Sequence, residues 1–302
     1  MGYGSYSYEA HEAMTRARKD LPQQEVFQQK ACHPKMDPYG VKLRESRDSA
    51  EHPNSLAVIM ALDVTGSMGN IPEILARQTF PSFMKDLMAA GIPDPQVLFM
   101  AVGDAYMDRA ALQVGQFESS EQQLDQWLTW MFLERGGGSN PGETYELGMY
   151  FAAEHTAMDC YEKRGKKGYY FTTGDEPGFP HVAKEHVEAL IGTKMTRDVP
   201  MEEVVSRLDK TFHPFFLIPD QRRRARCESF WRGYLGDRVI CMDDPADTCD
   251  VAAALVALTE GAVQSVDAIA ERLRAAGAPK ERVKGVVHAI EPWAKVLQRR
   301  AR

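Results

Sequence analysis

The sequence predicts an α/β fold in which a doubly wound, mostly parallel six-stranded sheet is flanked by helices. Short apolar runs recur along the chain, and amphipathic segments of helical spacing separate them. Such nearly continuous apolar runs are typical of parallel strands buried on both faces, which need crossover connections. Several runs also end in an acid or a hydroxyl residue. Because ligands of such sheets bind at the carboxyl ends of the strands, this edge is where we expect a site.

Each element is predicted from its local hydrophobic pattern, and Gly and Pro residues mark the element boundaries. We expect an N-terminal arm over residues 1–54, a globular domain over 55–261 and a C-terminal helical extension over 262–302. His213 lies in an apolar run, so we expect it to pack in a strand rather than bind a ligand. The predicted strands cover residues 56–62, 96–103, 111–115, 169–173, 211–219 and 238–242. The predicted helices cover residues 9–19, 72–90, 121–132, a segment beginning near 140, 228–235, 249–259 and two segments within 263–297.

Composition narrows the class of protein. Of the 302 residues, 44% are hydrophobic and 26% are charged, as in ordinary globular proteins. The formal net charge of −7 argues against a general nucleic-acid binder, and we expect the basic run Arg222–Arg226 to be a solvated surface. No apolar run reaches the length of a membrane span, and no signal-peptide pattern opens the chain. Five cysteines without a Cys-x-x-Cys pair favour reduced thiols, so we expect a cytoplasmic protein.

Three oxygen-bearing residues follow the first predicted strand. Asp63, Thr65 and Ser67 alternate along the loop, so an extended backbone could turn their oxygens toward one point. Hard oxygen ligands suit Mg²⁺, Mn²⁺ or Ca²⁺ rather than zinc. The competing interpretation is a turn in which Asp63 or Thr65 only caps the following helix. The strand before the loop and the helix after it favour a metal site.

This loop, Asp63-Val64-Thr65-Gly66-Ser67, resembles the Asp-x-Ser/Thr-x-Ser signature of von Willebrand factor A (vWA) domains. In that family the signature forms the first loop of the metal-ion-dependent adhesion site (MIDAS). The resemblance covers about residues 55–261 and implies a vWA/Rossmann-like sheet. It also implies two further loops at the same edge, each contributing to the ion.

The second loop is the glycine-rich segment that begins at Gly136. The family normally places a threonine here, whereas Ser139 is the hydroxyl nearest to the glycines in this chain. Ser139 is therefore the predicted ligand, with Asn140 and Thr144 as alternatives. We expect a helix to begin near Asn140 with Glu143 in its cap. Under the competing interpretation, Ser139 or Asn140 only caps that helix.

The third loop follows the strand at residues 169–173. The family pattern is Thr-Asp-Gly, whereas this chain has Thr173-Gly174-Asp175, with the acid beyond the glycine. Asp175 is the predicted ligand and Glu176 the reserve; alternatively both acids form the first turn of a following helix. Asp104, at the end of another strand, either supports the site from behind the ligands or stabilises its own turn.

The resemblance implies a metal-dependent protein-binding module, in which a divalent ion bridges to an Asp or Glu of a partner protein. One alternative is a hydrolase in which the ion activates water and Glu176 or Asp104 is the base. Another is a nucleic-acid-linked scaffold that uses Arg222–Arg226. No phosphate-binding Gly-x-x-x-x-Gly-Lys or dinucleotide Gly-x-Gly-x-x-Gly motif is present. We therefore expect binding rather than catalysis.

Overall fold

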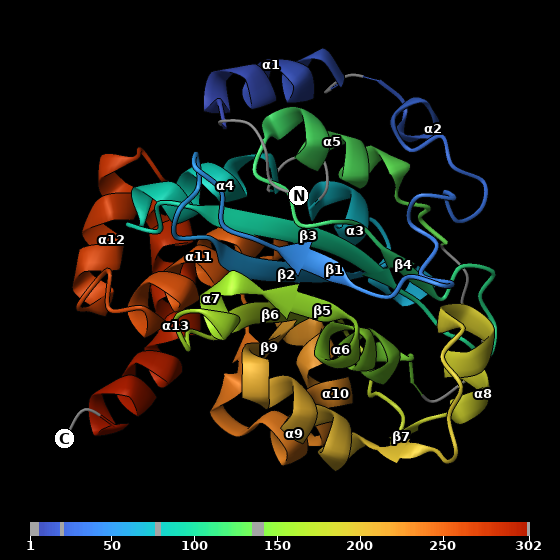
Figure 1. Cartoon of the computed structure of the whole chain (residues 1–302). Coiled ribbons are helices and arrows are strands. Elements are labelled where there is room, and N and C mark those ends of the chain that lie inside the picture. The colour runs from blue at the N-terminus through green and yellow to red at the C-terminus, as the bar shows by residue number, and fades with distance from the viewer. Residues whose placement is uncertain (1–5, 19–20, 76–79, 135–141, 301–302) are drawn as a thin grey trace.

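The computed structural model describes residues 6–18, 21–75, 80–134 and 142–300, and it contains the predicted six-stranded sheet (Figure 1). The strand order is β10-β9-β6-β2-β3-β4, and only β4 is antiparallel to its neighbour. The predicted fold class is confirmed. The strands are β2 (Leu56–Asp63), β3 (Pro95–Val102), β4 (Leu112–Val114), β6 (Gly168–Thr173), β9 (Phe212–Ile218) and β10 (Val239–Cys241).

Strand β2 is the centre of the sheet because it is buried along its whole length. All eight of its residues are buried, and it pairs with β3 on one side and β6 on the other. A strand covered on both faces cannot alternate polar and apolar side chains, which explains the continuous run from Leu56 to Leu62. Asp63 is the exception, and it stands where the strand opens into a loop.

The direction in which the chain adds strands reverses beside β2. From β2 the chain moves to β3 and then to β4 at one edge, whereas β6, β9 and β10 are added on the other side. The carboxyl ends of β2 and β6 therefore flank the topological switch point, where doubly wound sheets bind their ligands. Asp63 ends β2 and Asp175 follows β6 by two residues, so both acids lie at this point.

Helices lie on both sides of the sheet (Figure 1). Among them, α11 packs against α4 and α13, and α9 packs against α6 and α10. The helices are α1 (Tyr8–Arg18), α2 (Gln23–Val26), α3 (Ile71–Ile74), α4 (Phe80–Ala89), α5 (Glu121–Trp130), α6 (Tyr145–Glu154), α7 (Asp159–Glu162), α8 (Lys184–His186), α9 (Met201–Thr211), α10 (Gln221–Leu235), α11 (Thr248–Thr259), α12 (Val266–Ala275) and α13 (Lys280–Arg300).

Several elements differ from their predicted extent. The helix expected over 72–90 is described as α3 and α4, with residues 76–79 outside the described ranges. Helix α9 and two small sheets were not predicted. The strands of these two sheets are too short to show a hydrophobic pattern in the sequence. One sheet pairs β1 (Arg44–Ser46) with β5 (Thr156–Met158), and the other pairs β7 (His181–Val182) with β8 (Val199–Pro200).

Helix α10 begins seven residues earlier than predicted. The carboxylate of Asp220 accepts hydrogen bonds from the backbone N–H groups of Arg222 and Arg223, which caps the helix. The apolar periodicity begins only later, at residue 228, so it could not indicate this start. The earlier start places the basic run on a helix beside the carboxyl edge of the sheet.

The apolar core is continuous from the N-terminal segment to the last helix. Val26 and Phe27 belong to the same buried cluster as the sheet, and so do Ile290 and Trp293 of α13. The predicted boundaries at residues 54 and 261 remain predictions. Among the helices that the structure describes, none is both long and apolar enough to cross a lipid bilayer.

Candidate metal site

Asp63 is held by three hydrogen bonds at the end of β2. Its Oδ1 accepts from the backbone N–H of Thr65 at 2.9 Å and from the Thr65 hydroxyl at 2.6 Å. Its Oδ2 accepts from the hydroxyl of Tyr145. The side chain is fully buried, and burial raises the pKa of Asp63 to about 7, against the lowering effect of these bonds. A carboxylate in this setting favours either a proton or a cation.

The predicted ligands of the first and third loops form one hydrogen-bonded chain. The hydroxyl oxygens of Thr65 and Ser67 lie 3.1 Å apart. The Ser67 hydroxyl in turn donates to Oδ1 of Asp175 at 2.7 Å. The structure therefore brings Asp63, Thr65, Ser67 and Asp175 together, although the acid lies beyond the glycine in the third motif.

An arginine of α10 occupies the other side of Asp175. Nε of Arg223 donates to Oδ2 of Asp175 at 2.8 Å, and its Nη2 donates to the backbone carbonyl of Ser67 at 3.0 Å. Arg226 also approaches, with its Nη1 3.7 Å from Oδ2 of Asp175. The expectation that the whole basic run is a solvated surface is wrong for Arg223, because the early start of α10 directs this side chain into the site.

The second loop is only partly described. Ser139 and Asn140 lie outside the described residues, so their predicted roles remain predictions. Thr144 is described, and its hydroxyl donates to the carbonyl of Gly103 at 2.6 Å and accepts from the N–H of Ala105 at 3.1 Å. These bonds tie Thr144 to the end of β3 rather than to the Asp63 loop.

Helix α6 begins at Tyr145, later than the expected start near Asn140. The N–H of Glu143 donates to the carbonyl of Pro177 at 3.0 Å, and the N–H of Thr144 donates to the carbonyl of Gly103 at 3.2 Å. Because these two donors bond to neighbouring loops, the backbone before Tyr145 is held out of the helix. Glu143 consequently belongs to the loop and not to a helix cap.

Glu143 is a site residue that the sequence did not reveal. The residue is only 8% exposed, and its Oε2 has no hydrogen-bond partner among the described residues. Burial raises the pKa of Glu143 to about 9, and the negative charge of nearby Asp63 contributes, whereas the Thr65 hydroxyl lowers it. A buried carboxylate oxygen without a donor, beside a second acid, favours either a proton or a cation at this edge. In the sequence, a glutamate just before a helix resembles an ordinary cap.

Tyr145 is the second residue that the sequence did not reveal. Besides donating to Asp63, its hydroxyl accepts from the backbone N–H of Asp175 at 3.3 Å, so it joins the first and third loops. A Cβ at position 174 would lie only 2.5 Å from this hydroxyl oxygen. Only glycine fits there, which explains why the acid of the third loop comes one residue later in this chain.

Asp104 and the reserve acid Glu176 make other contacts. Oδ1 of Asp104 accepts from the N–H of Tyr106 at 2.9 Å, a contact within its own turn. Oε1 of Glu176 accepts from Nη1 of Arg226 at 3.0 Å. Residues 174–178 are not helical, so the alternative in which Asp175 and Glu176 open a helix is wrong.

The donor set fits a hard divalent ion rather than a soft one. In the described chain, no group of three or more His, Cys, Asp or Glu side chains is arranged to hold a metal ion by itself. An ion held here would need hydroxyl ligands as well, and the hydroxyls of Thr65 and Ser67 link Asp63 to Asp175 in one hydrogen-bonded chain. Such an all-oxygen set suits Mg²⁺, Mn²⁺ or Ca²⁺.

Comparisons with known proteins give distant structural matches. No protein-family model matches the chain, and no curated protein matches it. Proximal thread matrix protein 1 of the mussel byssus matches with 10% identity and a TM-score of 0.42, over 71% of this chain and 48% of that one. The open pilus adhesin SpaC of Lactobacillus rhamnosus GG matches with 12% identity and a TM-score of 0.47, over 75% and 31%.

A further structure of the mussel protein is described as having a zinc-occupied MIDAS motif. It matches with 11% identity and a TM-score of 0.40, over 66% of this chain and 46% of that one. The chain thus spans less than half the length of the structures it matches.

Proposed function

We propose that the chain is a divalent-ion-dependent protein-binding module. The observation that carries the proposal is the convergence of Asp63, Thr65, Ser67 and Asp175 at the switch point of the sheet. Beside them lies a carboxylate oxygen of Glu143 that has no hydrogen-bond partner among the described residues. Neighbouring buried carboxylates repel each other unless a proton or a cation intervenes. A bound ion would therefore relieve the repulsion between these carboxylates.

The ion would be held by the carboxylates of Asp63 and Asp175 and the hydroxyls of Thr65 and Ser67, with Glu143 from the second loop. Ser139 of the same loop remains a proposed contributor. When bound, the ion supplies a positive centre to which an Asp or Glu carboxylate of a partner protein can add. Tyr145 positions the first and third loops, because its hydroxyl hydrogen-bonds both Asp63 and the backbone of Asp175. Mg²⁺ is the proposed ion, with Mn²⁺ or Ca²⁺ as substitutes.

Arg223 places a positive charge directly beside the proposed oxygen ligands. Its guanidinium already neutralises Asp175, so a divalent ion must compete with it for that carboxylate. An arginine beside the ion also adds positive charge for a partner carboxylate to meet. We propose that Arg223 lowers the affinity for the ion while favouring an acidic partner.

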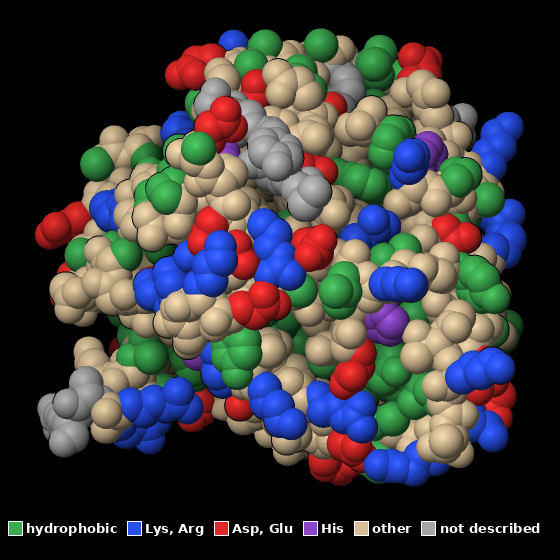
Figure 2. Space-filling model, viewed as in Figure 1, with side chains coloured by type: hydrophobic (Ala, Val, Ile, Leu, Met, Phe, Trp, Pro, Cys, Tyr) green, Lys and Arg blue, Asp and Glu red, His purple; other side chains and the backbone are tan. Residues whose placement is uncertain are grey.

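Two other arginines of the basic run are already paired with acids, which does not favour a nucleic-acid partner. Arg224 pairs with Glu228, with its Nη2 3.1 Å from Oε1, and Arg226 pairs with Glu176. On the face shown in Figure 2, basic and acidic side chains are interspersed. Since phosphate backbones are bound through unneutralised Lys and Arg, we propose an acidic protein as partner, in the cytoplasm, rather than RNA or DNA.

Affinity capture tests the proposal. Immobilised protein is incubated with the proteins of its own cell in Mg²⁺ and, separately, in chelator, and Asp63→Asn serves as the matched control because it keeps the size of the side chain. We expect at least one protein that is retained in Mg²⁺ by the unmodified chain and lost both with chelator and with Asp63→Asn. Identical captures under all three conditions would refute a metal-dependent module, and turnover of a phosphate or acyl ester that requires Asp63 would favour a hydrolase.

A further inference from the structure

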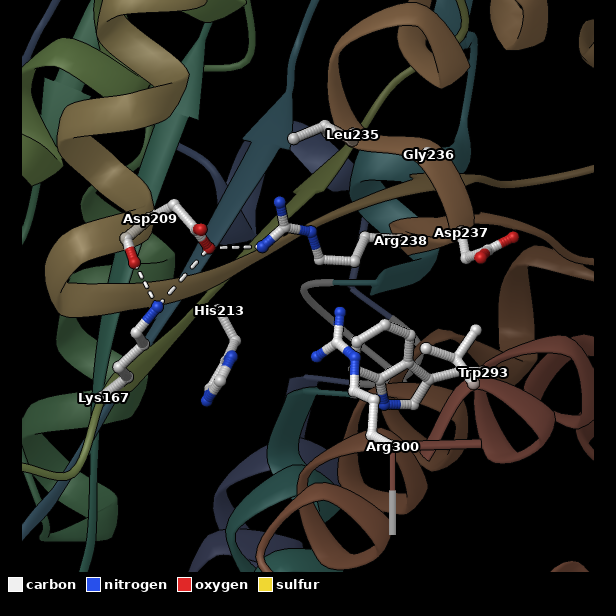
Figure 3. Close-up of a pocket in the computed structure, with 10 residues that line it drawn as sticks. Lys167, Asp209, His213, Leu235, Gly236, Asp237, Arg238, Trp293 and Arg300 are labelled. Carbon is white, nitrogen blue, oxygen red and sulfur yellow. Dashed lines mark hydrogen bonds and ion pairs between the residues drawn. The ribbon is translucent and has the colours of Figure 1, made fainter. Parts of the chain in front are cut away.

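A second cavity lies at the opposite, amino edge of the same sheet (Figure 3). Its volume is about 310 Å³, which is at the lower end of the range for small-molecule sites. It is lined where three parallel strands begin: Lys167 precedes β6, His213 is the second residue of β9, and Arg238 precedes β10. The last helix, α13, closes it with Trp293 and Arg300.

The basic side chains around this cavity outnumber the acids that neutralise them. Lys167 and Arg238 share one carboxylate, that of Asp209, with Lys167 Nζ 3.6 Å from its Oδ1. The other acid of the lining, Asp237, lies 3.9 Å from Arg299, which is outside the cavity. Arg300 pairs with no carboxylate in the described chain. The lining therefore carries three cations and two acids, an excess of one positive charge in a protein whose net charge is −7.

The geometry leaves Arg300 available to a ligand. Its guanidinium carbon lies 5.4 Å from the centre of the Trp293 ring, and Figure 3 shows the group in front of that ring. Stacking on an aromatic face fixes the plane of a guanidinium while its N–H groups remain able to donate. The indole N–H of Trp293 donates to Thr259 at 2.9 Å, so the ring contributes an apolar wall.

In Figure 3, His213 lies between Lys167 and Arg300. Burial lowers the pKa of His213 to about 4, and the positive charge of Lys167 contributes. The ring is therefore neutral at ordinary pH and offers one N–H donor and one acceptor. It packs on Tyr169, with ring centres 5.2 Å apart, so the expected packed strand histidine is also a wall of a cavity.

We propose that this cavity binds a small molecule bearing a phosphate group, or free phosphate. The excess of positive charge suits a phosphate anion, and arginine N–H groups match its oxygens in pairs. The phosphate would lie between Arg238 and Arg300, and a small organic part would contact Trp293 and Leu235. The limited volume excludes a large ligand. This site is independent of the metal site at the other edge.

Calorimetric titration at low, constant salt tests the proposal with three probes: inorganic phosphate, ribose 5-phosphate and succinate. The matched pair of variants is Arg300→Gln, which lines the cavity, and Lys295→Gln, which lies on the same helix outside it and pairs with Glu291. We expect one or both phosphates to bind, Arg300→Gln to weaken binding by about tenfold, and Lys295→Gln to change it by less than about twofold. Melting curves confirm that both variants fold.

The probes separate the possible sources of the phosphate. Tighter binding of ribose 5-phosphate than of inorganic phosphate indicates an organic phosphate, and the reverse indicates the free ion. Equal binding of succinate would overturn the preference for phosphate. Absence of binding, or equal losses in the two variants, would overturn the site itself.

Discussion

The two edges of the central sheet differ in the sign of their charge and in how the chain builds them. At the carboxyl edge, three carboxylates and two hydroxyls from three loops surround the switch point, with Arg223 as counter-charge. At the amino edge, Lys167, Arg238 and Arg300 surround a cavity with Asp209 as counter-charge. Under the two proposals, one sheet carries a cation site and an anion site at its opposite ends. The comparison leads us to expect that a doubly wound sheet can carry a second site away from its switch point.

The largest expected effect separates the two edges. Asp63→Asn removes a buried charge but keeps the shape of the side chain, so we expect Mn²⁺ affinity to fall by more than about 100-fold in calorimetric titration. Arg238→Gln, at the amino edge, should leave Mn²⁺ affinity unchanged. Comparable losses in both variants would mean that the edges are not independent sites.

Glu143→Gln tests whether Glu143, which the sequence did not indicate as a site residue, contributes to ion binding. The substitution removes one negative charge while preserving the volume of a buried side chain, and we expect Mn²⁺ affinity to fall by about tenfold. The control is Thr144→Val, whose hydroxyl bonds to the end of β3 and should affect stability more than ion binding. A larger loss of affinity in Thr144→Val than in Glu143→Gln would show that Thr144 is the ligand.

Arg223→Gln should act in the opposite direction. Removing the guanidinium frees Asp175 for the ion, so we expect Mn²⁺ to bind about tenfold more tightly. Arg224→Gln, on the same helix but paired with Glu228, should have no such effect. If Arg223→Gln binds Mn²⁺ more weakly than the unmodified chain, Arg223 positions Asp175 and does not compete for it.

The smallest expected effect is the pH dependence of the thermal stabilisation that the ion produces. The pKa values of Asp63 (about 7) and Glu143 (about 9) are raised above their ordinary values, so the metal-free folded state retains protons that the unfolded chain has released. Its stability should fall as pH rises through this window. An ion that replaces these protons should therefore stabilise the fold more at about pH 9 than at about pH 6. Melting curves with and without Mg²⁺ measure this difference, and equal shifts at both pH values would contradict it.

The carboxyl edge could be predicted in part because its first loop is local in sequence. Asp63, Thr65 and Ser67 lie within five residues, and the apolar strand before them identifies their place in the fold. Asp175 could be placed because the end of a neighbouring strand is also visible as a pattern.

The remaining features depend on contacts between distant segments. Arg223 reaches Asp175 only because Asp220 starts α10 early, and Tyr145 reaches Asp63 across 82 residues. The cavity at the amino edge combines segments near residues 167, 209–213, 235–238 and 293–300, none of which carries a motif. Local periodicity indicates elements, but it does not show which polar side chains meet after the elements pack.

Diffraction from crystals of the unmodified chain soaked in Mn²⁺, measured where manganese scatters anomalously, tests the metal site most directly. We expect one strong anomalous peak at the carboxyl edge, in contact with oxygens of the Asp63 loop and of Asp175 or Glu143. The same soak of Asp63→Asn should show no peak there. An anomalous peak elsewhere in the unmodified chain, with none in contact with the Asp63 loop, would contradict the proposed site.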